Sequence, residues 1–294
     1  MVKIVSELAP AKVNLYLRVT GRRIDGYHEL DSLMVPLALY DQLALEVRSS
    51  KSPTVTIRCD HPEIPADDRN LAMRAARAFV EEFALAFDVS IDLRKRVPAG
   101  AGLGGGSSDA AAVLRAMASL FRIDSRERLS AMALQIGADV PFFIDPRPAR
   151  ITGIGERVAP IGNLPRIHLV IAVPPTEVAT AKIFHALRPE NWSGPVSEAE
   201  FQAIAIAGMA PGTLVNDLES AAIAYCPEIA RLKSLLIEAG ARASAMSGSG
   251  GAVFGIFPDP AGASAAAQYV RQQAQSAAVF AVSTIDKLAA DRRL

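Results

Sequence analysis

Residues 98–112 read Pro-Ala-Gly-Ala-Gly-Leu-Gly-Gly-Gly-Ser-Ser-Asp-Ala-Ala-Ala, so five glycines and two hydroxyl side chains lead into an alanine-rich helix. Glycine lets backbone amides approach a ligand closely. A helix start presents free N–H groups and the positive end of the helix dipole. The pattern therefore predicts a loop that binds a phosphate group.

Three kinds of phosphate loop have to be distinguished. The G-x-G-x-x-G spacing also occurs in dinucleotide-binding folds, which need a continuously apolar parallel strand before the loop. Here that strand alternates with Asp92, Arg94 and Arg96, and a predicted helix follows where a second strand should lie. A Walker loop would carry a lysine where Gly106 stands. The sequence favours a third kind of nucleotide loop, whose charged groups come from elsewhere in the chain.

Two charged residues outside the loop could serve phosphoryl transfer, which needs a cation, a metal and a group that positions or deprotonates the acceptor hydroxyl. Lys12 lies on the polar face of an alternating strand over 9–19, and Asn14 and Tyr16 share that face. Asp139 is the one acid in an apolar stretch, where a carboxylate needs a partner. The alternative interpretations are that Lys12 is an ordinary solvent-exposed strand lysine and that Asp139 only forms a turn.

The apolar pattern predicts an α+β chain around these residues. Further strands are predicted over 33–48, 54–59, 89–97, 167–173, 242–246, 251–257 and 278–285. Helices are predicted over 70–87, from the glycine loop to 121, and over 124–137, 176–187, 213–239 and 260–276, with a loop at 188–198. Beyond residue 160 the order β-α-β-β-α-β is typical of a split βαβ sandwich. The two halves should meet near 150–165.

Composition limits the classes of partner. The 294 residues carry 31 basic and 31 acidic side chains, which argues against a nucleic-acid or an anionic-membrane partner. The chain shows neither a membrane-spanning apolar run nor a signal-peptide core. Its two cysteines have no metal-like spacing. We expect a soluble, cytoplasmic protein, and the sequence leaves its oligomeric state open.

Three motifs together resemble those of the GHMP kinases. Residues 9–15 (Ala-Pro-Ala-Lys-Val-Asn-Leu) are similar to the first motif of that superfamily, 98–112 to the second, and 246–251 (Met-Ser-Gly-Ser-Gly-Gly) to the third. Gly-Tyr-His at 26–28 and Gly-Ala-Asp-Val-Pro at 137–141 resemble the members that phosphorylate a cytidylyl alcohol in isoprenoid precursor biosynthesis. The resemblance extends from about residue 9 to beyond 255.

This resemblance implies a two-domain fold and an activity. An N-terminal domain resembling ribosomal protein S5 is expected over 1–160, and a ferredoxin-like domain over 161–294, with the active site in the cleft between them. The implied reaction is ATP-dependent transfer of a phosphoryl group to the 2-hydroxyl of the small cytidylyl substrate, with Mg²⁺. No residue is assigned to the metal.

The resemblance also implies roles for individual residues. Asp139 would act as the general base, and Lys12 would stabilise the developing charge. The residues expected to bind ATP are Asn70, Pro98, Gly100, Gly102, Leu103, Gly104, Gly105, Gly106, Ser107 and Ser108. The residues expected to bind substrate are Asn14, Tyr27, His28, Thr180 and Phe184. Tyr27 and His28 would recognise cytosine and Phe184 would form a second stacking wall, whereas Asp109 would serve only the loop or the helix cap.

Two other functions stay open at this point. One is a superfamily kinase that acts on homoserine or on a mevalonate-type alcohol, which has no base for Tyr27 and His28 to bind. The other is a ligand sensor that keeps the nucleotide fold without catalysis. The presence of both Lys12 and Asp139 argues against the sensor.

Overall fold

The computed structural model describes residues 2–162, 164–207 and 214–288. Its strands are β1 (Val2–Arg22), β2 (His28–Ser49), β3 (Val55–Cys59), β4 (Phe87–Arg94), β5 (Ala149–Gly153), β6 (Arg157–Pro160), β7 (His168–Val173), β8 (Ala243–Met246), β9 (Val253–Phe257) and β10 (Ala278–Ser283). Its helices are α1 (Leu71–Glu82), α2 (Gly105–Phe121), α3 (Arg126–Ile136), α4 (Val140–Ile144), α5 (Thr180–Ala186), α6 (Glu198–Ala207), α7 (Glu219–Tyr225), α8 (Glu228–Glu238) and α9 (Pro260–Gln273), with a 3-10 turn at Pro189–Asn191.

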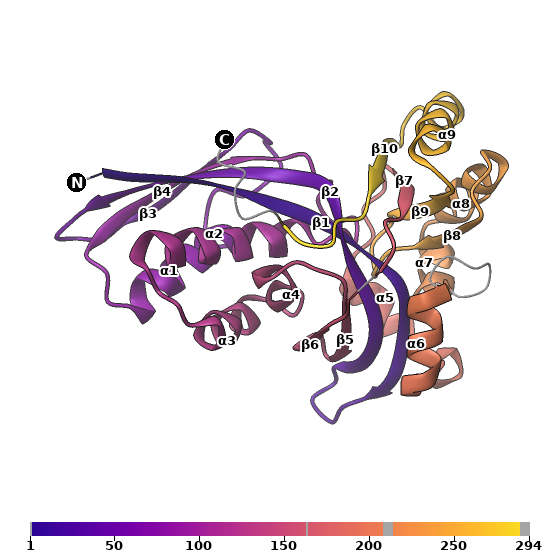
Figure 1. Ribbon diagram of the computed structural model, residues 1–294, viewed down its shortest axis with the longest axis horizontal. Helices are drawn as coiled ribbons and strands as arrows, with labels where there is room; N and C mark the ends of the chain where they lie inside the picture. Colours follow the sequence, from indigo (N-terminus) through magenta and orange to yellow (C-terminus); the bar gives the residue numbers. More distant parts are fainter. Residues whose placement is uncertain (1, 163, 208–213, 289–294) are drawn as a thin grey trace.

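Two sheets are joined by the long β1–β2 pair (Figure 1). The first sheet has the order β3-β4-β2-β5-β6 with β1 paired to β2, and α1, α2 and α3 lie along one face of it. The second sheet is antiparallel with the order β10-β7-β9-β8. That order is the ferredoxin-like one, so the predicted α+β fold is confirmed. The first sheet is mixed rather than parallel, which removes the dinucleotide-binding alternative.

Several predicted elements differ in extent. The helix predicted over 70–87 ends at Glu82, because Ala84 has a positive φ of 45° and the chain then enters β4. The helix predicted over 213–239 is two helices, α7 and α8. Pro227 separates them, since proline lacks the N–H that would continue α7. Residue 213 itself lies outside the described residues. The elements β5, β6, α4 and α6 were not predicted.

The strand β1 is buried on both faces where it passes between the halves of the molecule. Every residue from 8 to 17 is buried, including Lys12 and Tyr16, which are 3% and 1% exposed. The alternating pattern over 9–19 predicted a half-buried strand, and this prediction was wrong for residues 9–17. The C-terminal half covers part of the polar face, where the Tyr16 ring meets the Phe201 ring edge-on at 6.4 Å and both belong to one apolar cluster.

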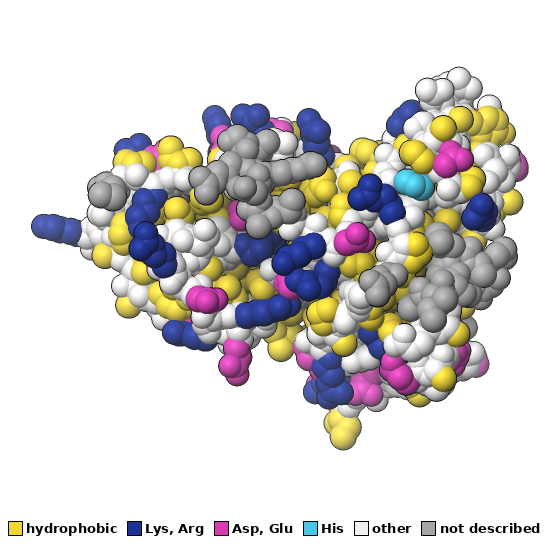
Figure 2. Space-filling model, in the orientation of Figure 1, with side chains coloured by type: hydrophobic (Ala, Val, Ile, Leu, Met, Phe, Trp, Pro, Cys, Tyr) yellow, Lys and Arg dark blue, Asp and Glu magenta, His cyan; other side chains and the backbone are white. Residues whose placement is uncertain are grey.

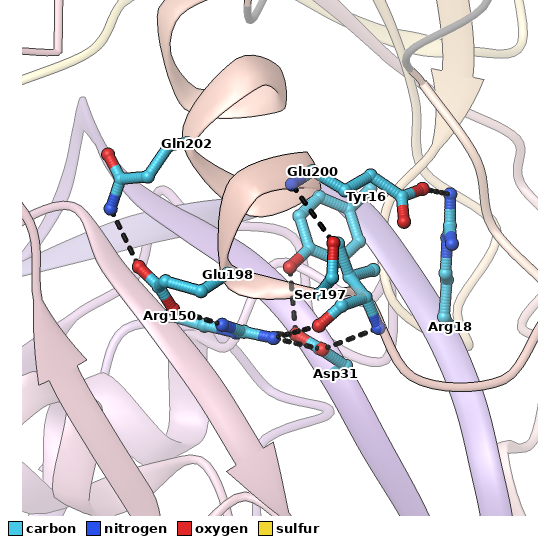
Figure 3. Close-up of polar contacts among 9 residues, drawn as sticks. Tyr16, Arg18, Asp31, Arg150, Ser197, Glu198, Glu200 and Gln202 are labelled. Atoms are coloured by element: carbon cyan, nitrogen blue, oxygen red, sulfur yellow. Dashed lines mark hydrogen bonds and ion pairs between the residues drawn. The ribbon is translucent and has the colours of Figure 1, made fainter.

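A buried ionic network centred on Asp31 of β2 holds α6 against the first sheet (Figure 3). Asp31 accepts hydrogen bonds from the Tyr16 hydroxyl at 2.8 Å and from the Arg150 guanidinium at 2.6 and 3.0 Å. Arg150 also pairs with Glu198 at 2.9 Å and lies 4.6 Å from the Phe201 ring. Burial alone would raise the pKa of Asp31, but the hydrogen bonds from Arg150 and Tyr16 hold that pKa below its usual value. Helix α6 thus covers the part of the β1–β2 pair that lies toward the turn between these two strands.

The surface carries charges of both signs. Basic and acidic side chains lie mixed over the face seen in Figure 2. Within the described ranges, no helix combines the length and the apolar character that crossing a bilayer would require.

Candidate active site

The glycine loop connects β4 to α2 and leaves the first turn of that helix open. Gly100, Gly102 and Gly104 have φ values of 64°, 78° and 73°, in the left-handed region that other residues rarely adopt. Gly104 is the N-cap, and no side chain caps the helix. The amides of the first turn are therefore available to a ligand, as at other helix starts that bind anions.

A second glycine loop, residues 246–251 between β8 and β9, packs directly on the first. Ser247 Oγ donates to the carbonyl of Gly102 at 3.1 Å, and the N–H of Ala252 donates to the carbonyl of Ala101 at 3.0 Å. A Cβ added to Gly102 would overlap the carbonyl oxygen of Ser247. The two halves of the chain thus meet at the cradle, and the approach at Gly102 is too close for a residue with a Cβ.

Two register shifts in β1 flank the lysine and the asparagine of the first motif. One shift precedes Lys12 and the other follows Asn14, and such irregularities re-aim side chains. Lys12 Nζ donates to Asn14 Oδ1 at 2.6 Å, and Asn14 Nδ2 donates to Ser32 Oγ at 2.8 Å. The backbone N–H of Lys12 donates to the carbonyl of Leu103 at 2.9 Å. The lysine is therefore fixed both to β2 and to the glycine loop.

Asp139 lies at the N-terminus of α4, a short helix whose five residues are all buried. Its Oδ2 atom is 3.5 Å from Lys12 Nζ, and its side chain is 33% exposed. Arg115 of α2 donates to the carbonyl of Phe143 in α4 at 2.5 Å. The lone acid of the apolar stretch thus has the cationic partner that its surroundings require, and it still faces solvent.

A cavity of about 600 Å³ joins these groups, a size typical of small-molecule sites. The predicted site residues that line it are Lys12, Asn14, Asn70, Pro98, Gly100, Gly102, Gly104, Gly105, Gly106, Ser107, Asp139, Thr180 and Phe184. Asn70 also caps α1 by accepting the N–H of Ala72 at 2.9 Å. Leu103 and Ser108 are buried outside this lining, and Ser108 Oγ has no hydrogen-bond partner among the described residues.

The residues predicted to bind cytosine are only partly together. The rings of His28 and Phe184 lie 5.4 Å apart with an interplanar angle of 32°, and Trp192 meets His28 edge-on at 5.9 Å. Burial, and secondarily Arg22, lower the pKa of His28, which favours a neutral imidazole. Tyr27 is 62% exposed, and neither Tyr27 nor His28 lines the cavity. The roles of Tyr27, His28 and Phe184 in recognising the base stay predictions.

One buried cluster beside the cradle was missed. Lys95 Nζ lies 2.5 Å from Asp41 Oδ2 and 2.7 Å from Asp109 Oδ2. Asp109 was expected to serve the loop or the helix cap, but the cap is Gly104 and the carboxylate pairs with Lys95. A signal was present, because Lys95 falls on the apolar face of its strand pattern and a lysine there requires a buried acid.

Comparison with known proteins identifies the family. Residues 70–145 match the model of the GHMP kinases N terminal domain, and 202–276 match that of the GHMP kinases C terminal domain. A 4-diphosphocytidyl-2-C-methyl-D-erythritol kinase of Anaeromyxobacter dehalogenans (strain 2CP-C) is 44% identical over 92% of this chain and 86% of its own length. The chain belongs to this family of GHMP kinases. The family member of Deinococcus radiodurans is 40% identical over 90% of this chain and 88% of its own.

Solved structures agree with this membership. A crystal structure of 4-(cytidine 5'-diphospho)-2C-methyl-D-erythritol kinase superposes with a TM-score of 0.82 at 39% identity, covering 95% of this chain and 98% of the other. A homoserine kinase from Cytophaga hutchinsonii has a TM-score of 0.74 at 17% identity, covering 97% and 95%. The second likeness extends to the fold alone. As a member of the 4-diphosphocytidyl-2-C-methyl-D-erythritol kinase family, this chain is an enzyme, which removes the sensor alternative.

Proposed function

We propose that this chain transfers the γ-phosphoryl group of ATP to the 2-hydroxyl of 4-diphosphocytidyl-2-C-methyl-D-erythritol. One observation carries the proposal: Lys12 and Asp139 lie 3.5 Å apart in the same cavity as an open helix start. Phosphoryl transfer needs an acceptor-activating group and a cation beside a phosphate cradle. The names of relatives that are 40–44% identical support this choice of substrate over homoserine or a mevalonate-type alcohol.

In the proposed step, the 2-hydroxyl lies against Asp139 and gives its proton to that carboxylate. The hydroxyl oxygen forms a bond to the γ-phosphorus as the bond from that phosphorus to the β,γ-bridging oxygen breaks, which leaves ADP. Lys12 stabilises the negative charge that develops on the acceptor oxygen and the transferring group. Asn14 keeps the Lys12 ammonium in place through the 2.6 Å hydrogen bond.

ATP would be held through its phosphates by the amides of the glycine loop. The positive φ values of Gly100, Gly102 and Gly104 form a cradle that a Cβ would strain or fill. The described residues contain no cluster of three or more His, Cys, Asp or Glu side chains suited to a metal. We therefore assign Mg²⁺ to the phosphate oxygens of ATP, where it would neutralise charge, since this ion commonly keeps its waters and few protein ligands.

The cytidylyl group would lie in the part of the cavity that Phe184 lines. Phe184 stacks with His28, a neutral imidazole suited to hydrogen bonding with a base. We assign base recognition to this pair together with Tyr27, which would have to move from its exposed position to contribute a ring. Asn14 and Thr180 are assigned to the substrate's polar groups.

The test is product formation with ATP and the cytidylyl substrate in Asp139→Asn and Lys12→Met. Loss of the general base in Asp139→Asn should lower kcat about 10²- to 10⁴-fold. The dissociation constant of ATP should stay within about threefold of the wild-type value, because the phosphate cradle is intact. Asp92→Asn is the matched control, because Asp92 has a similar exposure and pairs with Arg58 outside the cavity. Unchanged turnover in both folded variants would refute the mechanism. Preference for homoserine or mevalonate in a substrate panel would refute the choice of acceptor.

A further inference from the structure

Three charged side chains are buried together outside the proposed chemistry. Lys95, Asp41 and Asp109 have side chains that are 5%, 0% and 4% exposed. Lys95 Nζ bridges the two carboxylates at 2.5 and 2.7 Å. Burying two acids and one cation costs desolvation energy. None of the three residues takes part in the proposed phosphoryl transfer. The cluster therefore calls for a role of its own.

The position of the cluster in the chain connects it to the glycine loop. Asp41 Oδ1 accepts the backbone N–H of Arg96 at 2.5 Å and that of Val97 at 2.8 Å, directly before the loop. Asp109 lies in the first turns of α2, directly after the loop. Lys95 joins the two sides, so both ends of the loop are fixed to one ammonium group and, through it, to β2.

The ammonium also lies against the cradle itself. A Cβ added to Gly105, the first residue of α2, would be 3.2 Å from Lys95 Nζ. Both Lys95 and Asp109 line the cavity. The second carboxylate oxygen of Asp109 is buried without a hydrogen-bond partner among the described residues. Asp109 is thus held by Lys95, and removal of that lysine would leave two neighbouring buried acids uncompensated.

We infer that Asp41, Lys95 and Asp109 form a clasp that fixes the two ends of the glycine loop and so sets its fit to the phosphates of ATP. The inference rests on the proposed function, because it takes ATP as the ligand of the loop. These are positioning residues, since they act through the backbone of the loop. Their loss should weaken ATP binding and leave the part of the cavity assigned to the cytidylyl group unaffected.

The experiment measures the dissociation constants of ATP and of the cytidylyl substrate separately, by calorimetry on the full chain. Lys95→Met should weaken ATP binding at least about tenfold, or about 1.4 kcal/mol, because the loop loses the ammonium group that joins its two ends. Binding of the cytidylyl substrate should change less than about twofold. Lys3→Met is the matched control, because Lys3 Nζ ties β1 to the carbonyl of Leu120 at the other end of α2 at 3.2 Å.

Asp109→Asn is the second variant, and it decides the outcome if Lys95→Met does not fold. It keeps the shape of the side chain and replaces the carboxyl group that Lys95 contacts at 2.7 Å with an amide, so ATP binding should weaken in the same direction. Equal weakening of both ligands, or unchanged ATP binding in folded variants, would overturn the clasp. Failure of the wild-type chain to bind ATP would instead overturn the proposed function, and the clasp with it.

Discussion

The pKa values of two buried aspartates, Asp31 and Asp109, are shifted in opposite directions. Asp31 receives hydrogen bonds from Arg150 and Tyr16, which outweigh burial and lower its pKa. Asp109 is raised to a pKa of about 7, first by burial and then by the neighbouring Asp41 carboxylate, against the opposing effect of Lys95. Partners, rather than burial alone, decide which acid keeps its charge near neutral pH.

The raised pKa of Asp109 makes stability depend on pH. Between its ordinary value of 3.8 and about 7, the folded chain holds a proton that the unfolded chain has released. The contribution of Asp109 to the free energy of unfolding therefore falls as the pH rises through this window. Urea unfolding should measure the free energy of unfolding of the wild type and of Asp109→Asn. The wild-type value minus the variant value should be smaller at about pH 8 than at about pH 5, by at least about 1 kcal/mol. A difference that is constant or grows with pH would contradict this.

Several residues of the candidate active site could be predicted from the residue types and their spacing in the sequence. The sequence pattern indicates both Lys12 and Asp139, and in the structure these two side chains lie 3.5 Å apart. The clasp was not predicted, because its three members lie on β2, at the end of β4 and on α2. Pairing across separate elements leaves no local spacing to detect, and only the lysine on an apolar face indicated it.

Among the structural elements, the two glycine loops depend on each other. The first loop and the start of α2 were predicted, since glycine and helix-start signals are local. That residues 246–251 pack on residues 101 and 102 follows only from the approach of the second sheet. The shifts in β1 and the docking of α6 were likewise absent from the pattern, because both depend on what covers the β1–β2 pair.

Loop packing predicts different effects for two glycine substitutions. A Cβ at Gly250 would overlap the backbone of Ala101 and Gly102, whereas one at Gly162 meets nothing within 4 Å. Gly250→Ala should lower the free energy of unfolding by about 1–3 kcal/mol and weaken ATP binding, because backbone atoms cannot move aside cheaply. Gly162→Ala is the control and should change neither quantity. Urea unfolding and ATP titration measure both, and equal behaviour of the two variants would contradict the packing.

For the whole molecule, the β1–β2 pair makes the two halves interdependent. Leu17 and Val19 of β1 belong to the apolar cluster of the C-terminal half, together with Val170. A central cluster combines Val13 with Ile171. The domain boundary at 160/161 stays a prediction, and residues 163, 208–213 and 289–294 of the second predicted domain lie outside the described residues. Shared apolar clusters of this kind favour cooperative unfolding.

We therefore expect one unfolding transition for the full chain. The single tryptophan, Trp192, reports on the C-terminal half, while far-ultraviolet circular dichroism reports on both halves. Their urea curves should coincide within error. A fragment of residues 161–294 should not show a cooperative transition, because it lacks the β1 side chains that complete its core. Two separate transitions in the full chain, or a cooperative fragment, would show that the halves are independent.

Local signals in the sequence were enough to predict the α+β class, the phosphate loop, Lys12 and Asp139, because backbone preferences and apolar periods are encoded over a few residues. The sequence also carried the resemblance to the GHMP kinases. Three features depend on the folded arrangement instead: β1 is buried on both faces, Asp109 pairs with Lys95, and the second glycine loop packs on the first. Each of these depends on which distant surfaces meet, and burial and charge pairing are properties of that meeting rather than of either segment alone.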